Sequence, residues 1–247
     1  MIGREFLEKT TYRHLGPSEQ ARGIAQPQLQ LTPERDGRLL IDLPKPRETP
    51  LRQMPLAAAI DRRVSVRSYA AAPLTIAELS WLLWCTQGVR EVILHQATLR
   101  TVPSAGARHA LETYLLVNRV TGLRPGLYRF VAIGHQLLEM DGLQDPCLLI
   151  RAACLGQQMV TGSAVTFIWT AVIRRMTWRY GARGYRYVFL DAGHVCQNLY
   201  LAAQDVGCGV CAVAAFDDEA MNRILGINPE EQFTVYLATL GKVEAAG

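Results

Sequence analysis

A helical pattern of apolar residues stands out in the first half of the chain. Leu79, Leu82 and Leu83 form one apolar face, as expected for a helix that packs on a hydrophobic core. Thr75 and the glutamate three residues later have the spacing of a capping box, so the helix should begin after Thr75. Gly88 favours the end of the helix at that position.

The rest of the chain alternates between strand-like and helix-like apolar runs. Alternating or β-branched runs predict strands, and longer apolar runs with helix caps predict helices. The predicted strands are 110–120, 126–132, 136–140, 163–176, 211–215 and 232–241; the predicted helices are 54–61, 145–158 (capped by Asp145), 185–207 and 217–225; and 89–102 is a predicted loop. Early hairpins and late crossovers make the fold class α+β.

Residues 1–53 lack this regular pattern. They are polar and proline-rich, as in QPQLQLTPERDG and DLPKPRETP, and only the segment 4–15 suggests a short helix. Such a segment either hangs free or wraps a neighbouring surface. The change in composition at Met54 predicts an irregular N-terminal arm, residues 1–53, followed by one folded domain, residues 54–247.

Composition narrows the function classes only slightly. The 247 residues are 49% hydrophobic and 19% charged, with a formal net charge of +4, which fits a globular protein with a sizeable core. Lys and Arg are scattered except in two clusters, so the charge alone does not indicate a nucleic-acid partner. No apolar run is long enough to cross a membrane, and the first residues lack the apolar core of a secretory signal. We expect a cytoplasmic protein without a membrane or nucleic-acid partner.

The six cysteines mostly lie in apolar runs, as expected for reduced, buried thiols. Cys208 and Cys211 form a C-x-x-C pair, a pattern that elsewhere serves redox chemistry or zinc binding. A zinc site needs further ligands, and the nearest histidine, His194, is interpreted as a core residue of an apolar helix. A thioredoxin-type pair should open a helix, whereas this pair follows one. Buried thiols and no metal site are therefore the favoured interpretation.

The first basic cluster is RRVSVRSY, residues 62–69. Arginine has a planar fork that meets phosphate oxygens at two points, and a serine adds a hydroxyl donor. Arg63, Ser65 and Arg67 alternate, so in an extended segment their side chains share one side. The cluster is a candidate phosphate site, and a solvated basic loop is the alternative.

Two further segments could line a ligand. The small and rigid residues at 103–107 let backbone groups approach a flat ligand closely, or simply form a loop before a strand. In 174–187, arginines alternate with aromatic residues. This arrangement suits an anionic or aromatic substrate, a nucleic acid, or a rim of side chains above a buried helix. Neither a P-loop nor a strand-borne G-x-G-x-x-G is present, so no Rossmann site for a nicotinamide cofactor is expected.

Six motifs, in order between Met54 and Lys242, resemble those of the nitroreductase-like flavoproteins. They are R-x-S-x-R, L-T-x-x-E-L-x-x-L-L-W-x-x-Q-G, P-S-A-G-A-R, G-L-Y, Y-G-x-R-x-Y-R-Y and G-H-V-x-Q-N-L. Within that group the chain is most similar to the SagB-type dehydrogenases, which include oxidases of peptide thiazolines and oxazolines (azolines). The resemblance implies a nitroreductase-like fold with a mixed or antiparallel central sheet flanked by helices. It also implies a homodimer with FMN at the subunit interface.

The resemblance assigns roles to particular residues. The implied FMN-binding residues are Arg63, Ser65, Arg67, Pro103, Ser104, Ala105, Gly106, Ala214, Ala215 and Lys242. The residues at 63–67 would hold the phosphate and ribityl chain, and Lys242 would return toward the phosphate. The loop 103–106 would lie along the flavin ring, with 214–215 covering the ring near its reactive nitrogen.

Two positions depart from the family pattern. Azoline oxidases have a catalytic Lys-Tyr pair where this chain has Arg179 and Tyr180. An arginine stays protonated near neutral pH, so Arg179 can bind an anion but cannot serve as a general base. Tyr180 remains the candidate for proton transfer. Ala214 and Ala215 stand where common nitroreductases often have a Glu-Gly pair, which leaves the tuning of the flavin open.

The sequence therefore predicts an FMN-dependent oxidoreductase that transfers a hydride between flavin and a small-molecule or peptide substrate. Oxidation of peptide azolines to azoles is one candidate reaction, since the flavin supplies the redox chemistry and the protein positions it. A generic NAD(P)H-dependent nitroreductase-like reductase is the alternative enzyme. A non-catalytic scaffold subunit of a peptide-modification complex is the alternative outside the enzymes.

Overall fold

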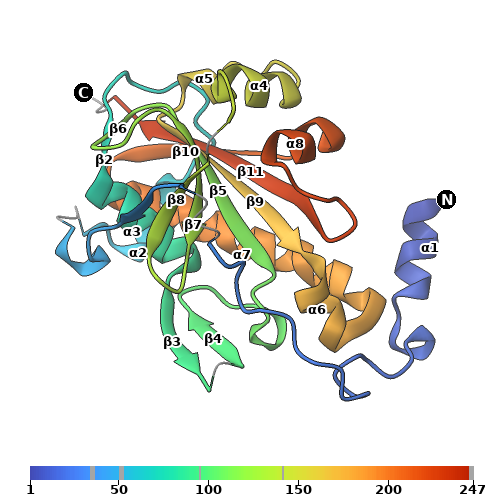
Figure 1. The fold of residues 1–247 in the computed structure, drawn as a ribbon. Coiled ribbons are helices and arrows are strands. Elements are labelled where there is room, and N and C mark those ends of the chain that lie inside the picture. Colours follow the sequence, from blue (N-terminus) through green and yellow to red (C-terminus); the bar gives the residue numbers. More distant parts are fainter. Residues whose placement is uncertain (34–36, 50–52, 95, 141, 245–247) are drawn as a thin grey trace.

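One antiparallel sheet of seven strands runs through the centre of the molecule (Figure 1). The computed structural model describes the whole chain except residues 34–36, 50–52, 95, 141 and 245–247. The sheet strands are β1 (Leu40–Asp42), β5 (Leu111–Val117), β7 (Gly126–Val131), β8 (Gln136–Met140), β9 (Val165–Val172), β10 (Cys208–Val213) and β11 (Gln232–Lys242). Their order across the sheet is β1-β8-β7-β5-β9-β11-β10. Two short pairs lie outside it: β2 (Leu74–Thr75) with β6 (Val120–Thr121), and β3 (Val89–Ile93) with β4 (Ala97–Arg100).

Helices cover both faces of this sheet. They are α1 (Ile2–Lys9), α2 (Leu56–Arg62), α3 (Ile76–Gln87), α4 (Pro146–Ala153), α5 (Met159–Gly162), α6 (Ile173–Tyr180), α7 (Gly184–Asp205) and α8 (Asp218–Leu225). Four short 3-10 turns are Tyr12–His14, Pro46–Glu48, Ala105–Ala107 and Gly181–Arg183. None of the described helices is long and apolar enough to cross a membrane.

Alternation along the central strands divides the apolar residues between two cores. Leu115 and Phe167 face α3 and α7 in the larger core, whereas Leu116 and Ile168 face α4, α5 and α8 in the smaller one. Successive side chains of a strand point to opposite faces, so a strand covered on both sides is apolar throughout. This explains why β5 and β9 read as nearly continuous apolar runs.

The predicted fold class is confirmed, and most predicted elements are present. Thr75 caps α3 through a complete capping box, as expected. The loop predicted at 89–102 is wrong, because its alternating residues pair as the hairpin of β3 and β4. The strand predicted at 163–176 ends at Val172, where the arginine-rich sequence turns into α6. Asp145 precedes α4 but makes no side-chain cap bond, because its backbone is left-handed.

The N-terminal arm, residues 1–33 as used below, lies against α6 and then reaches the sheet (Figure 1). The helix suggested at 4–15 is shorter, since α1 ends at Lys9 and a 3-10 turn follows. The amide of Gln20 donates to the carbonyl of Trp178 (2.9 Å), and the Trp178 indole donates to the carbonyl of Ile24 (2.8 Å). The division of the chain at residue 53 stays a prediction, because β1 within residues 1–53 pairs with β8.

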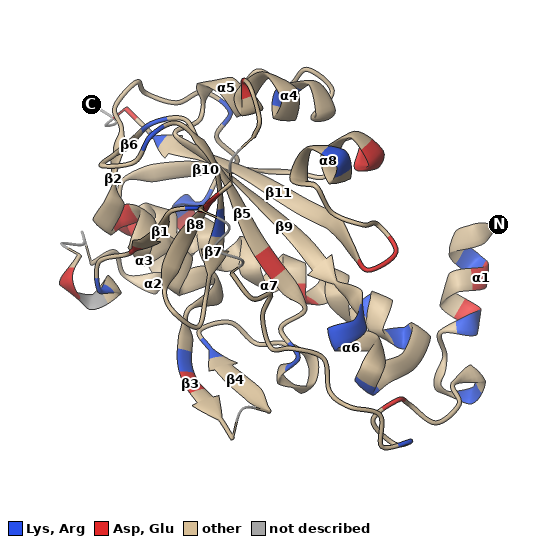
Figure 2. Cartoon of the chain, viewed as in Figure 1, with Lys and Arg blue, Asp and Glu red and all other residues tan. Residues whose placement is uncertain are grey.

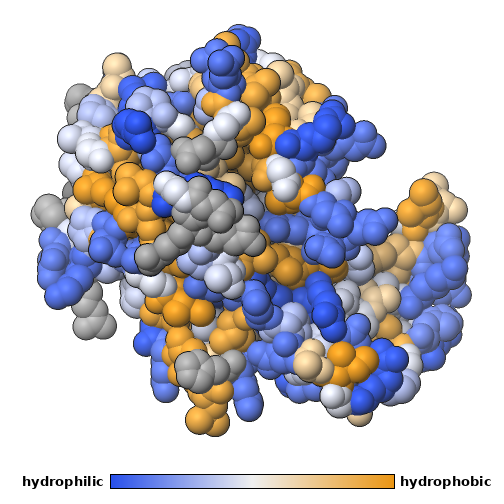
Figure 3. Space-filling model, viewed as in Figure 1, coloured by the Kyte–Doolittle hydropathy of each residue, from blue (hydrophilic) through white to orange (hydrophobic). Residues whose placement is uncertain are grey.

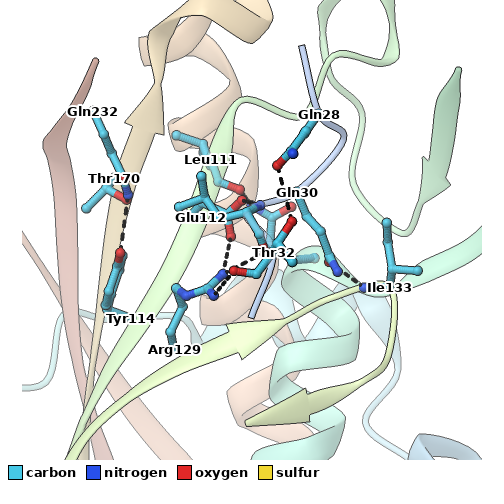
Figure 4. A network of polar contacts seen from close by, with 12 residues as sticks. Gln28, Gln30, Thr32, Leu111, Glu112, Tyr114, Arg129, Ile133, Thr170 and Gln232 are labelled. Atoms are coloured by element: carbon cyan, nitrogen blue, oxygen red, sulfur yellow. Dashed lines mark hydrogen bonds and ion pairs between the residues drawn. The ribbon is translucent and has the colours of Figure 1, made fainter. Parts of the chain in front are cut away.

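A buried carboxylate fastens this arm to the sheet (Figure 4). Glu112 of β5 accepts from the backbone amide of Leu31 (2.9 Å) and from the guanidinium of Arg175 (2.6 Å). The Arg129 guanidinium lies 3.7 Å from the second carboxylate oxygen and donates to the carbonyls of Leu31 and Thr32. The Glu112, Arg129 and Arg175 side chains are only 3–6% exposed. The arm therefore satisfies buried charges that have no access to water.

Replacing Glu112→Gln should destabilise the protein strongly. The change leaves two guanidinium groups buried beside a neutral amide, and breaking a buried ion pair from one side costs about 3–5 kcal/mol. The free energy of unfolding in urea measures this cost. Glu19→Gln is the matched control, because its partner Arg174 is 57% exposed and exposed pairs contribute about 1 kcal/mol or less. Equal losses in the two variants would contradict the anchoring role of Glu112.

Candidate functional site

The arginine-serine row follows α2 and lies against the edge of the sheet. Ser65 bridges Val210 of β10 in parallel register, and its hydroxyl shares a 3.0 Å hydrogen bond with the hydroxyl of Tyr200. The guanidinium of Arg63 lies 5.5 Å from the centre of the same Tyr200 ring. Val66 packs inward, where a Cβ on Gly209 would meet it at 2.6 Å. Ser65 and Arg67 are exposed on the other side, as the alternation predicts.

The end of β11 returns to this row. The amide of Ala70 donates to the carbonyl of Lys242 (2.9 Å), so the strand end and the segment after the row are hydrogen-bonded neighbours. The ammonium of Lys242 is bound to Glu78 (2.5 Å) and to the carbonyl of Val206 (2.7 Å). The structure thus brings Lys242 near the row, with its charge already engaged by Glu78.

Ala214 and Ala215 follow the other end of β10 and are exposed. Ala214 lines an open cavity of about 740 Å³ that Phe216, Phe233 and Tyr236 make largely aromatic. The backbone of Ala215 accepts from Gln157 (2.9 Å). From Val210 to Ala214 the chain advances by about 13 Å at strand spacing. A phosphate at the arginine-serine row and a flat ring in the cavity could belong to one mononucleotide.

The loop 103–106 lies elsewhere, against the N-terminal half of α7. The hydroxyl of Ser104 donates to Asp191 (2.5 Å), and the amide of Ala105 donates to the second oxygen of Asp191 (3.3 Å). Pro103 is exposed beside them. Burial raises the pKa of Asp191, and the bonds from Ser104 and Ala105 act against that rise. The aspartate fixes the loop and leaves its outer side free.

Gly106 brings this loop onto the candidate catalytic pair. Its φ of +57° is left-handed, and a Cβ there would lie 2.5 Å from the Tyr180 hydroxyl and 2.9 Å from Nε of Arg179. Ala107 and His109 are also left-handed, with φ of 54° and 44°. Non-glycine residues seldom adopt this conformation, and strained backbone tends to gather at functional sites. Only a glycine at 106 allows Arg179 and Tyr180 to lie so close to the loop.

The structure therefore separates the sequence-predicted residues into two groups. Tyr200 holds the arginine-serine row, and Asp191 holds the 103–106 loop with Arg179 and Tyr180 beside it. Nine helical residues between Asp191 and Tyr200 correspond to about 14 Å along α7 and about half a turn around it. The two groups lie on opposite faces of one helix, so they do not meet around a single ligand within one chain.

Sequence reasoning missed two anchors and misplaced one histidine. Tyr200 and Arg108 received no role, and Asp191 was noted only for its spacing to His194. A polar side chain within an apolar helix was the available signal for Asp191 and Tyr200. His194 is exposed rather than buried in the core, because it faces away from the sheet side of α7. Cys208 and Cys211 are free, buried thiols in β10, and the described residues contain no cluster suited to a metal.

Most of the basic cluster 174–187 contacts the arm (Figure 2). Arg174 pairs with Glu19, and Arg175 pairs with Glu112. Arg183 donates to the carbonyl of Thr10 (2.9 Å) and to the hydroxyl of Tyr187 (2.8 Å). The remaining arm-bound arginine, Arg186, donates to the Thr10 hydroxyl (2.6 Å) and to a backbone carbonyl of α1. Four of these arginines therefore serve the internal structure.

A model of the nitroreductase family matches residues 60–242. The chain belongs to the nitroreductase family. Members of this family are FMN-dependent oxidoreductases. Both groups of candidate site residues fall inside the matched segment, whereas the N-terminal arm lies outside it.

Two relatives differ in how much of the chain they share. A nitroreductase-family protein of Methanocaldococcus jannaschii, MJ1384, is 34% identical over 78% of this chain and 93% of its own length. The trifolitoxin-processing protein TfxB of Rhizobium leguminosarum bv. trifolii is 28% identical over 53% of this chain. This chain spans only 36% of the length of TfxB.

Solved structures of the nitroreductase family share the fold. A structure from Anabaena variabilis, 29% identical, aligns with 85% of this chain and 42% of its own chain at a TM-score of 0.70. A chain of the E. coli microcin synthetase McbBCD complex, solved with truncated pro-MccB17 bound, is 15% identical and aligns with 99% of this chain and 92% of its own at 0.63. A nitroreductase from Desulfovibrio desulfuricans in complex with FMN is 13% identical and aligns with 79% of this chain and 92% of its own at 0.54. The last two likenesses concern the fold alone.

The buried His109 should make stability fall in acid. Burial, followed by the charge of Arg100, lowers the pKa of His109 to about 3. Between pH 6.5 and that value the unfolded chain binds a proton that the folded chain does not, so unfolding becomes easier as the pH falls through 6.5. The slope should approach about 1.4 kcal/mol per pH unit. Urea unfolding at pH 7.5, 6.0 and 5.0 measures it.

His109→Asn is the informative variant, since asparagine tolerates the left-handed backbone and does not titrate. We expect it to flatten the pH dependence of the unfolding free energy, whereas His194→Asn, at an exposed position, should leave the dependence unchanged. An unchanged slope in His109→Asn would show that other groups cause the acid sensitivity.

Proposed function

We propose that this chain is an FMN-dependent oxidoreductase of the SagB type that acts as a homodimer. The observation that supports this most is the exposed row of Arg63, Ser65 and Arg67 on one end of β10, with an aromatic cavity at the other end. Guanidinium groups and a hydroxyl recognise a phosphate, and a largely aromatic cavity accepts a flat ring. The donors therefore fit FMN, and the family match points to the same cofactor.

Within that proposal each group has a distinct task. Arg63 and Arg67 bind the FMN phosphate, and Ser65 adds a hydroxyl bond while Tyr200 orients it. Lys242 contributes positive charge, which Glu78 partly balances. Ala214 and Ala215 cover the ring and present backbone amides in place of a glutamate side chain. When bound, FMN supplies the redox chemistry by accepting or giving a hydride.

The site is completed by a second copy of the chain. The arginine-serine row and the 103–106 loop lie on opposite faces of α7 and cannot enclose one flavin together. Large apolar side chains on α2 and α7, including Leu56, Ile60, Phe189 and Leu190, are 55–65% exposed. A two-fold dimer would cover them and bring the loop of one subunit to the flavin of the other. This arrangement gives two sites per dimer.

The proposed substrate is a peptide azoline that is oxidised to an azole. Two comparisons support this class: TfxB is named for the processing of a peptide toxin, and the microcin synthetase chain comes from a complex with a peptide bound. The alignment with the synthetase chain extends over 99% of this chain, so it includes the N-terminal arm. An NAD(P)H-dependent reductase is the alternative reaction for the same cofactor.

Tyr180 is the proposed proton carrier. Oxidation of an azoline removes a hydride, which passes to the flavin, and a proton from the neighbouring atom. The hydroxyl of Tyr180 lies against Gly106 of the proposed ring-binding loop, and the Tyr187 ring packs edge-on at 4.8 Å to fix its ring. Arg179 beside it stays protonated and has no part in accepting the proton.

The purified protein should be yellow and release FMN on heating. Arg63→Gln with Arg67→Gln should weaken FMN binding by at least about tenfold, because hydrogen bonds to charged groups contribute about 1.5–3 kcal/mol each. Titration of the cofactor-free protein with FMN, followed by flavin fluorescence, measures this. Arg62→Gln, exposed at the end of α2, should leave the affinity unchanged. A colourless protein that takes up no added FMN would disprove the enzyme and leave a scaffold subunit.

Tyr180→Phe should slow flavin reduction by an azoline-containing peptide by about 10²–10⁴-fold, the usual contribution of a positioned proton carrier. Binding of FMN should not change. Anaerobic stopped-flow absorbance of the flavin gives the rate directly. Tyr185→Phe is the control, since the Tyr185 ring stacks on Phe233 at 6.1 Å. Flavin that NADPH reduces but no azoline peptide reduces would favour the generic reductase.

A further inference from the structure

Arg179 differs from the other arginines of its cluster. Arg174, Arg175, Arg183 and Arg186 all bond to carboxylates, carbonyls or hydroxyls of the same chain. The described residues provide no carboxylate or carbonyl within bonding distance of the Arg179 guanidinium, whose recorded neighbour is the ring of Tyr180, 5.7 Å from its centre. Arg179 is also exposed. Its positive charge is therefore available at the surface of the proposed site.

A second guanidinium lies on the same loop residue. Nε of Arg108 donates to the carbonyl of Gly106 (2.9 Å), while a Cβ on Gly106 would lie 2.9 Å from Nε of Arg179. Arg108 is buried, and it also donates to the carbonyl of Gln96 and lies over the Trp178 ring. Burial, followed by the charge of Arg179, lowers the pKa of Arg108. Two like charges thus meet around Gly106.

The acidic group nearest in the site is already engaged. Both oxygens of Asp191 accept bonds from the 103–106 loop, one from Ser104 and one from the amide of Ala105. Glu112, the other buried acid of this region, pairs with Arg175 and Arg129. Like charges without a counter-charge repel each other, and an anion placed between them removes that repulsion. An arginine fork is also well shaped to hold a carboxylate at two points.

We propose that Arg179, supported by Arg108, forms a subsite for a carboxylate of the substrate. The inference rests on the proposed function and narrows its substrate class to azolines that carry a carboxylate close to the ring that is oxidised. Arg179 binds the carboxylate, Arg108 adds positive charge behind it, and Tyr180 lies beside the reacting ring. The arginine at this position then acts in substrate specificity rather than as a catalytic base.

A pair of matched probes tests this assignment. Thiazole-4-carboxylate carries the proposed anion on an azole ring, and thiazole-4-carboxamide has the same shape without the charge. Isothermal titration of each into the FMN-loaded dimer, together with the shift of the flavin absorbance, measures binding without turnover. The carboxylate should bind at least about tenfold more tightly than the amide, as expected for a charge-assisted contact. This preference should weaken as the salt concentration rises.

Arg179→Gln should abolish the preference for the carboxylate, and Arg179→Lys should keep part of it because the charge remains. Arg174→Gln is the matched control, since it removes an exposed arginine of the same helix that pairs with Glu19. An unchanged unfolding midpoint in Arg179→Gln confirms that the variant is folded. Protein that holds FMN but binds both probes equally, or keeps its preference in Arg179→Gln, would overturn the subsite and leave the proposed function standing. Protein that holds no FMN would instead contradict the proposed function.

Discussion

The position of one buried helix, α7, determines where both parts of the candidate site lie. The helix is held between α3 and α6 on one side and the strands β10 and β11 on the other, so its rotation is fixed by packing on several faces. Asp191 and Tyr200 are its two inward-facing polar anchors, and each holds a different segment. Half a turn of helix separates them, and this geometry follows from their spacing in the sequence. A ligand that needs both segments must be shared between two chains.

The charges of this protein are divided between internal bonds and the candidate site. The buried trio of Glu112, Arg129 and Arg175 binds backbone groups of the N-terminal arm, so the arm is part of the folded structure and not a separate tail (Figure 4). By contrast, the arginine-serine row is exposed. Apolar side chains also gather at the tip of the β3–β4 hairpin, where Leu94 is 80% exposed (Figure 3). Exposed apolar surface of this kind fits a chain that pairs with a partner.

The sequence alone was enough for the elements whose pattern is long and regular. The capping box of α3 and the apolar runs of β5, β9 and α7 were recognisable because local pattern and tertiary environment agree there. The β3–β4 hairpin was missed because its strands are short and half exposed, so they lack a strong apolar alternation. The chain reversal at Val172 was missed because β-branched residues continue into the first turn of α6. Motif order indicated the site residues, but only the structure separates them into two groups.

The cluster 174–187 shows what a sequence cannot decide about charge. Five arginines of equal composition suggested one function, yet four of them bond to the arm or to the buried trio, and these partners come from distant parts of the chain. Sequence spacing carries no information about such partners. Arg179 is set apart by what surrounds it, namely a left-handed glycine, a second guanidinium and an aspartate already saturated with bonds. A lysine at this position could lose its proton and act as a base, whereas an arginine keeps its charge. The same geometry therefore supports proton transfer with one residue and anion binding with the other.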